Sequence, residues 1–69
     1  MSFQIFVNEE SLTVEAKTSV EDVLLDIGIK EFAGVAVALD NAVVSREDWK
    51  ATYFKPEQTL VVFTAAQGG

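Results

Sequence analysis

One segment of this chain has the residue spacing of an amphipathic helix, and the segments on both sides of it alternate like β-strands. Its apolar residues recur at the spacing that places side chains on one face of a helix: Val20, Val23, Leu24 and Ile27. Thr18 and Glu21 fit a capping box with Thr18 as the N-cap, and Gly28 is the expected end of the helix. A single helix of this length covers one face of one sheet, which restricts the chain to a small α+β domain.

The apolar residues outside this helix predict five strands. Their ranges are residues 3–7, 12–15, 35–39, 42–44 and 59–64. The continuous apolar content of the last range favours a central strand that is buried on both faces. The predicted order of elements is β-β-α-β-β-β, in a single domain that spans residues 1–69.

Polar residues mark the connections between these elements. Residues 8–10 fit a hairpin loop, and Asp40 with Asn41 fits a tight turn. Ser45 is the expected N-cap of a short helical turn that ends near the tryptophan. Pro56 is the expected second residue of a turn before the last strand.

The composition excludes several classes of function. The chain of 69 residues has no cysteine and no histidine, so disulfides, thiolate metal sites and the commonest general base are all missing. We therefore do not expect an enzyme or a metal site. The net charge of −6 offers no basic patch for nucleic acid. No apolar stretch reaches the roughly 20 residues of a membrane span, and no secretory signal is evident. A cytoplasmic protein is expected.

The sequence ends on Gly68 and Gly69, shortly after the last predicted strand. Glycine loses more conformational entropy on ordering than any other residue, so residues 65–69 are expected to form a flexible tail. Such a tail is slim enough to enter a narrow site, and its carboxylate suits a carrier whose C-terminus reacts inside a partner enzyme. A frayed end without function has the same composition, so the glycines alone leave both interpretations open.

Strand alternation predicts which side chains of the sheet point away from the helix. If Ile5 and Leu60 face the helix, then Phe6, Val61 and Phe63 lie on the opposite face. An open apolar patch of these three residues would suit partner binding. The alternative is that the segment of residues 51–55 covers them.

Other chemically distinctive residues are expected to have structural roles. Trp49 and Tyr53 fit core or lid positions better than ligand contacts, and Arg46 fits a contact with a neighbouring carboxylate better than a contact with a partner. Several carboxylates are adjacent or close in the sequence, but without histidine, cysteine or an evident pocket we interpret them as solvated surface. These residues are Glu9, Glu10, Glu21, Asp22 and Asp26.

The order of elements together with the Gly-Gly end resembles the ubiquitin-like β-grasp fold, a mixed sheet of about five strands packed on one main helix. Within that fold, three stretches are similar to the sulfur carriers of thiamine biosynthesis, in the ThiS/MoaD family. They are residues 5–9, 18–24 and 44–49. That family usually has a Gly-Asp turn before its last strand. This chain has Pro56 there, for which a type I turn is expected.

The resemblance implies a role for the end of the chain. In the family, a ThiF-like adenylating enzyme uses ATP to convert the carboxylate of the last residue, here Gly69, to an acyl-adenylate. A sulfur donor, derived from a cysteine desulfurase, then displaces AMP and leaves a thiocarboxylate, from which a ThiG-like thiazole synthase takes the sulfur. Gly68 lets the backbone approach the nucleotide closely. The chain itself would bind no cofactor, and ATP would be a substrate of the activating enzyme.

Three other functions stay open at this point. The small subunit of molybdopterin synthase shares the fold and the Gly-Gly end. A ubiquitin-like modifier would be conjugated to target lysines through Gly69. An interaction module would not need its tail at all.

Overall fold

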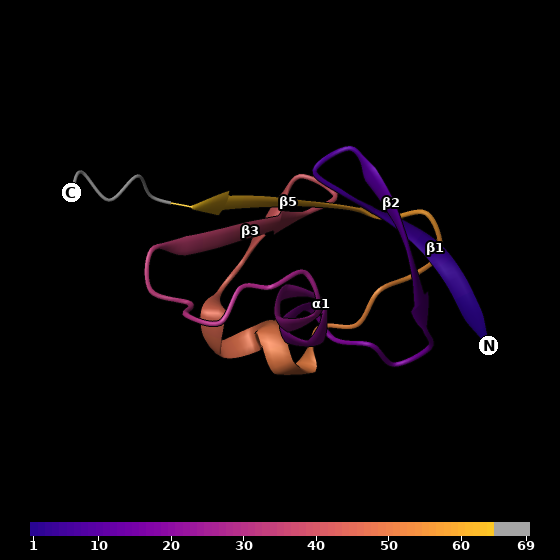
Figure 1. The fold of residues 1–69 in the computed structure, drawn as a ribbon, viewed down its shortest axis with the longest axis horizontal. Coiled ribbons are helices and arrows are strands. Elements are labelled where there is room, and N and C mark those ends of the chain that lie inside the picture. Colours follow the sequence, from indigo (N-terminus) through magenta and orange to yellow (C-terminus); the bar gives the residue numbers. More distant parts are fainter. Residues whose placement is uncertain (65–69) are drawn as a thin grey trace.

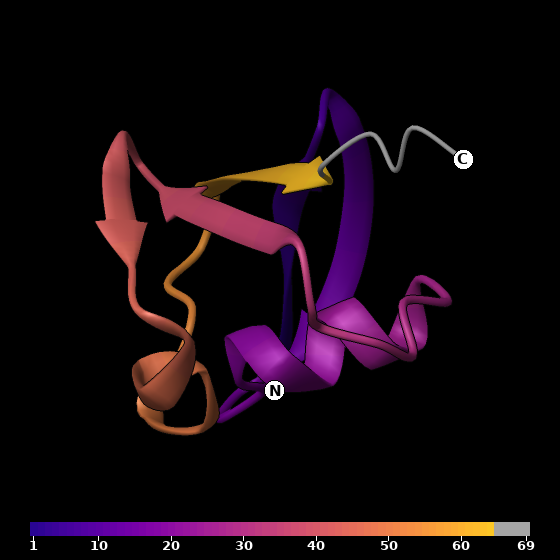
Figure 2. The same ribbon diagram turned by 90° about the vertical axis from the view of Figure 1, so that its left-hand side faces the viewer.

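The computed structural model describes residues 1–64, which form a mixed sheet of five strands with helices on one side (Figure 1). The strands are β1 (Ser2–Val7), β2 (Glu10–Glu15), β3 (Val35–Leu39), β4 (Ala42–Val44) and β5 (Thr59–Thr64). The helices are α1 (Val20–Asp26) and the 3₁₀ helix η1 (Arg46–Ala51). Figure 2 shows both helices on the same side of the sheet. The predicted order of strands and helix is confirmed.

The sheet has the strand order β2-β1-β5-β3-β4, so the last strand in sequence lies at its centre. β5 pairs in parallel with β1, and the other three pairings are antiparallel. It follows that β2 and β3, which α1 connects, run in the same direction although β1 and β5 separate them. The predicted central position of the last strand is confirmed.

Both hairpins close through two-residue turns with positive φ at each central residue, which is type I′ geometry. The values are 47° and 75° at Asn8 and Glu9, and 48° and 72° at Asp40 and Asn41. The expectation of a loop over residues 8–10 is wrong by one residue, because Glu10 pairs with Val7 as the first residue of β2. A two-residue I′ turn matches the twist of the strands that it joins, which favours this tighter connection.

The N-cap of α1 is Ser19, so the prediction of Thr18 is wrong by one residue. The Ser19 hydroxyl accepts a hydrogen bond from the Asp22 amide at 3.1 Å, and the Asp22 carboxylate accepts one from the Ser19 amide at 3.1 Å. Thr18 still belongs to the preceding turn, since its amide donates to the carbonyl of Glu15 at 3.1 Å. The capping box therefore uses Asp22 in place of Glu21.

Gly28 ends α1 as expected. Its φ of 99° lies in the left-handed region that favours glycine. The Gly28 amide donates to the carbonyl of Leu25 at 3.1 Å, and the Ile29 amide donates to that of Leu24 at 2.9 Å. This pair of bonds is a Schellman motif, and it satisfies two carbonyls that the end of a helix would leave unpaired.

Two further local predictions need correction. Ser45 precedes η1 as expected, but its side chain makes no capping hydrogen bond. Its carbonyl instead accepts from the Asp48 amide at 2.8 Å, the i to i+3 spacing of a 3₁₀ helix. The turn that contains Pro56 has a φ of 66° at Glu57, which is the signature of type II and not type I. The Glu57 amide donates to the carbonyl of Gln4 at 2.7 Å, and this bond orients the central peptide of the turn toward β1.

The core lies between the sheet and the two helices. Trp49 is 1% exposed, and its indole nitrogen donates to the carbonyl of Val44 at 2.9 Å. The Trp49 ring meets Phe32 edge to face, with a centroid distance of 5.2 Å. Trp49 is thus confirmed as a core residue, whereas Tyr53 is 53% exposed and is not. The fully buried aliphatic residues are Ile5, Val20, Val23, Leu24, Val37 and Leu60.

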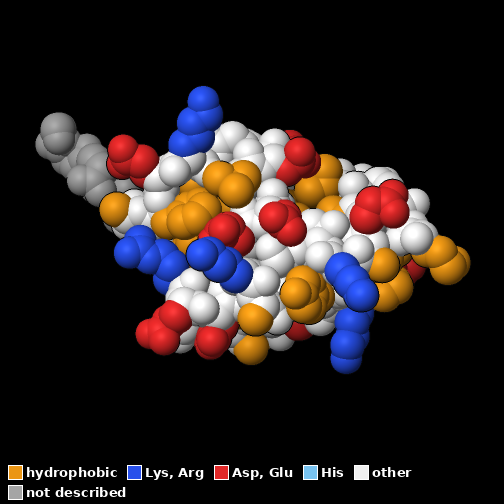
Figure 3. All heavy atoms as spheres, turned by 90° about the horizontal axis from the view of Figure 1, so that it is seen from below, with side chains coloured by type: hydrophobic (Ala, Val, Ile, Leu, Met, Phe, Trp, Pro, Cys, Tyr) orange, Lys and Arg blue, Asp and Glu red, His pale blue; other side chains and the backbone are white. Residues whose placement is uncertain are grey.

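The helix side of the molecule is polar in character. Acidic and basic side chains there are interspersed with separate apolar ones (Figure 3). Neither helix in residues 1–64 combines the length and the apolar character that crossing a membrane requires.

The position of the N-cap can be tested by substitution. Ser19→Ala removes the hydroxyl that accepts from Asp22, so we expect the free energy of unfolding to fall by about 1 kcal/mol. Thr18→Ala is the matched control, because Thr18 makes no capping contact, and a change below about 0.5 kcal/mol is expected. Urea unfolding of both variants measures the difference. An equal loss in the two variants would contradict the assignment of Ser19.

Candidate functional site

β5 is the last described element in the sequence, and it ends at Thr64. β5 is hydrogen-bonded to β1 on one edge and to β3 on the other, and Leu60 within it is fully buried. Gly69, the predicted site of modification, and Gly68, the predicted access residue, lie outside the described residues. What the structure does show is how firmly the strand that leads to them is held.

The start of β5 is fixed by a carboxylate from the β3–β4 turn. Asp40 accepts a hydrogen bond from the Thr59 amide at 2.9 Å and another from the side-chain amide of Gln58 at 3.1 Å. The Asp40 amide donates in return to the carbonyl of Thr59 at 2.9 Å. The side-chain oxygen of Gln58 also accepts from the Lys55 amide at 2.8 Å. These bonds join the turn before β5 to the hairpin beside it.

A second contact holds β5 near its end, and it comes from Asn8. The paired part of β1 ends at Val7, opposite Leu60. Beyond it, the Asn8 backbone amide donates to the carbonyl of Leu60 at 3.0 Å, and the Asn8 side-chain oxygen accepts from the Val62 amide at 2.9 Å. The Asn8 side-chain nitrogen lies 3.5 Å from the carbonyl of Val62, which is a weak bond at best. The side-chain amide therefore continues the β1–β5 ladder after the strand has ended.

This role of Asn8 was not predicted from the sequence. Its only sequence signal is an asparagine at the first position of a two-residue hairpin turn, where positive φ is tolerated. That signal explains the backbone conformation but not the partner, because Val62 is 54 residues away in sequence.

The sheet face away from α1 carries the predicted apolar patch. Val61 lies opposite Ala38 on β3, and Phe63 lies opposite Ala36. Phe63 is 56% exposed, and Val61 and Phe6 are half-buried. We call the surface of Phe6, Val61 and Phe63 the open face. The expectation that β5 is buried on both faces is wrong, because no element covers this face in residues 1–64.

Residues 51–55 do not cover the open face. The carbonyl of Thr52 accepts a hydrogen bond from the Val20 amide at 2.9 Å, and Tyr53 forms an isolated β-bridge with Ser19. Phe54 is 6% exposed and belongs to the core. The segment thus lies beside the start of α1, on the other side of the sheet.

The charged residues form no catalytic cluster in the described part of the chain. No three acidic side chains in residues 1–64 are grouped so that they could hold a metal ion. The only ion pair there joins the N-terminal amine to Glu15 at 3.7 Å. Arg46 is exposed, and the expected contact with a neighbouring carboxylate is not formed.

Known proteins resemble this chain both in sequence and in fold. The model of the ThiS family matches residues 2–69. A crystal structure of a thiamine biosynthesis protein (ThiS) from Geobacter metallireducens has a TM-score of 0.78 and 26% identity, and the match covers 97% of this chain and 100% of that one. A solution structure of a thiamine biosynthesis protein from the same organism has a TM-score of 0.74 and 27% identity, with coverage of 97% and 87%. A search among curated proteins gave no match. The predicted β-grasp fold is confirmed by these structural neighbours.

The contact between Asn8 and Val62 can be tested within one turn. Asn8→Gly keeps the positive φ and removes the side chain, so we expect a loss of about 1 kcal/mol in the free energy of unfolding. Hydrogen exchange at the Val62 amide should also become faster. Glu9→Gly is the matched control, because glycine relieves a positive φ there and should leave stability unchanged or raise it by up to about 1 kcal/mol. Unchanged exchange at Val62 in the Asn8 variant would contradict the contact.

Proposed function

This chain belongs to the ThiS family, and on that basis we propose that it is a sulfur carrier of thiamine biosynthesis, a protein co-substrate and not an enzyme. The observation that supports the proposal is the extent of the family match, which runs from the first strand through Gly69. A domain of this kind has two tasks. It presents its own C-terminus, and it offers a surface by which partner enzymes recognise it.

We propose that the reacting group is the Gly69 carboxylate. One of its oxygens would attack the α-phosphorus of ATP in an adenylating enzyme, which forms an acyl-adenylate and releases pyrophosphate. The persulfide sulfur of a donor protein would then attack the acyl carbon, and AMP would leave with the carboxylate oxygen. A thiol on a partner protein would form a disulfide with the donor sulfur and release the thiocarboxylate. The partner would supply the metal and the phosphate contacts.

The residues of this chain suit that chemistry. With no cysteine in the sequence, no internal thiol can attack the activated carboxylate. Gly68 leaves the backbone without a side chain next to the reacting group, which favours entry into a narrow nucleotide site. β5 would act as a rigid base for the tail, because Asp40 binds its first residue, Thr59, and Asn8 binds Val62 within it. A cytoplasmic location agrees with the use of ATP and stays a prediction.

The open face is the surface that we propose for docking on the adenylating enzyme and on the synthase. It is apolar, it belongs partly to the strand that leads to the tail, and Phe63 on it is more than half exposed. Aromatic residues are frequent among those that contribute most to interface energy. The net charge of −6 would in addition steer the domain toward a basic partner surface.

The thiazole pathway is the version that the comparisons favour over molybdopterin synthesis. The two solved structures named above are each described as a thiamine biosynthesis protein. No feature of residues 1–64 favours conjugation to other proteins or a tail without function. We therefore propose a single function.

The reaction at the tail can be tested by intact mass. The protein incubated with an adenylating enzyme of this family, ATP and a persulfide donor should gain the mass of one oxygen-to-sulfur exchange, confined to Gly69. Gly68→Phe should block the exchange because the side chain obstructs the nucleotide site, and its unfolding should match that of the unchanged protein. Conjugates of higher mass on a denaturing gel, with no exchange of oxygen for sulfur, would contradict the proposal.

Docking through the open face can be tested at Phe63. Phe63→Ser should raise the KM of the adenylating enzyme for this protein by roughly tenfold or more, because it truncates an exposed aromatic contact. The matched control is Tyr53→Ser, since Tyr53 is exposed to nearly the same extent, 53% against 56%, but lies beside the start of α1. Steady-state adenylation kinetics measure both. Equal KM values for the two variants would show that the open face does not take part in the interface.

A further inference from the structure

β2 forms one border of the sheet, and its outer edge is unpaired among the described residues. The two-residue turn makes Val7 and Glu10 a hydrogen-bonded pair, so Glu10, Leu12 and Val14 bond to β1. The same alternation continues past the strand, where the Ala16 amide donates to the carbonyl of Met1 at 2.9 Å. The backbone groups of Ser11, Thr13 and Glu15 therefore point outward. This row of three donors and three acceptors is a template for a further strand.

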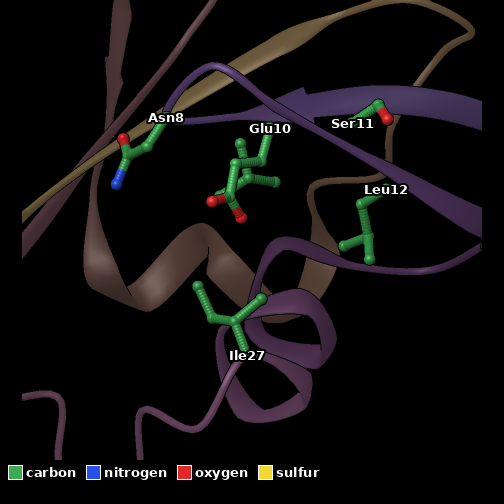
Figure 4. Close-up of a pocket in the computed structure, with 6 residues that line it drawn as sticks. Asn8, Glu10, Ser11, Leu12 and Ile27 are labelled. Atoms are coloured by element: carbon green, nitrogen blue, oxygen red, sulfur yellow. The ribbon is translucent and has the colours of Figure 1, made fainter.

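Two hollows lie along the same strand, between β2 and α1. The first has a volume of about 240 Å³ and is lined by Glu10 and Leu12 of β2 and by Ile27 after α1. Figure 4 shows the side chains of Glu10 and Leu12 directed from β2 toward Ile27. The second has a volume of about 230 Å³ and lies between Thr13–Glu15 and the residues Asp22 and Asp26 of α1. We call the two hollows together the β2–α1 seam.

The seam has one sign of charge. Glu10, Asp22 and Asp26 border it, Glu15 stands at the end of β2, and no lysine or arginine lines either hollow. Glu10, Asp22 and Asp26 form no ion pair within residues 1–64. Apolar surface is present as well, since Ile27 is 42% exposed and Leu12 is half-buried. A lysine or arginine side chain combines the matching properties, an apolar stem and a positive end.

We propose that the β2–α1 seam binds an extended basic segment of a partner protein, which adds to the free edge of β2 as a sixth strand. Side chains of an added strand alternate between the two faces of the sheet. Those on the helix side lie over the seam, where lysine or arginine stems pack on Leu12 and Ile27 and their charges meet Glu10 and Asp26. This surface is separate from the open face, and the inference does not rest on the proposed function.

A second copy of the chain does not fit this edge. Antiparallel pairing through the outward groups of two β2 strands would place the helices of both copies on the same side of the joined sheet. The two acidic seams would then lie next to each other, and each copy carries a net charge of −6. Repulsion between like charges disfavours such a pair. The opposite border of the sheet is a weaker template, because β4 has three residues and presents outward only the backbone groups of Val43.

The test is a titration of the ¹⁵N-labelled full chain with a short peptide in which lysine alternates with threonine or valine, blocked at both ends. We expect saturable shifts of the amide signals of Ser11, Thr13 and Glu15. The Val43 amide, on the other border, should not shift. A peptide of the same sequence, N-methylated at alternate residues on its hydrogen-bonding edge, should bind at least tenfold more weakly, because it cannot pair with β2.

Variants separate the charge of the seam from the charge of the whole protein. Glu10→Gln combined with Asp26→Asn should weaken peptide binding by roughly tenfold, because two ion pairs are lost. Glu31→Gln combined with Glu47→Gln makes the same change in net charge at two residues that line neither hollow, and should leave the affinity within about twofold. Asp22 is kept in both, since it caps α1.

Several outcomes would overturn the inference. They are the absence of saturable binding, equal binding of the N-methylated peptide, and shifts centred on the open face or on Val43. Equal losses of affinity in the two double variants would assign the binding to net charge alone. A further outcome is that concentrated protein without peptide shows the same amide shifts together with a doubled mass in solution. That result would mean that the edge of β2 pairs with a second copy of the chain.

Discussion

The arrangement of this small domain depends on one constraint, which is that its central strand must be hydrogen-bonded along both edges. β5 joins the β1–β2 hairpin to the β3–β4 hairpin, and neither hairpin pairs with the other directly. Two side-chain contacts support this junction where backbone pairing is short. Asp40 binds the first residue of β5, and Asn8 binds Val62 after β1 has ended. Both contacts pair backbone amides of β5 that would otherwise be left to solvent.

The type and order of the elements could be predicted from the sequence, because they depend on patterns within short windows. The spacing of apolar residues in α1 and the alternation in the strands each specify a buried face. Local detail was less predictable. Thr18 and Ser19 are adjacent hydroxyl residues, each followed three residues later by an acid, so the sequence fits either as the N-cap. The choice follows from the turn before the helix, which holds the Thr18 amide on Glu15.

In the candidate site, too, some features could be predicted from the sequence and others could not. Alternation predicted that Phe6, Val61 and Phe63 share a face, because that inference needs only the period of a strand. The predicted type of the turn at Glu57 was wrong, because the observed type depends on a hydrogen bond from Glu57 to Gln4 on a different strand. The contact between Asn8 and Val62 and the seam beside β2 were not predicted for the same reason. Each depends on which segments the sheet brings together, and a single sequence does not contain that information in any local window.

The central position of β5 has a consequence for the order in which the fold can form during synthesis. The two hairpins consist of residues that are close in sequence, so each can pair as soon as it is made. The strand that unites them is the last described element to be made. Until residue 64 is available, the two hairpins have no strand in common, and the inner edges of β1 and β3 have no partner. The element that leads to the terminal glycines is thus also the one whose arrival closes the sheet.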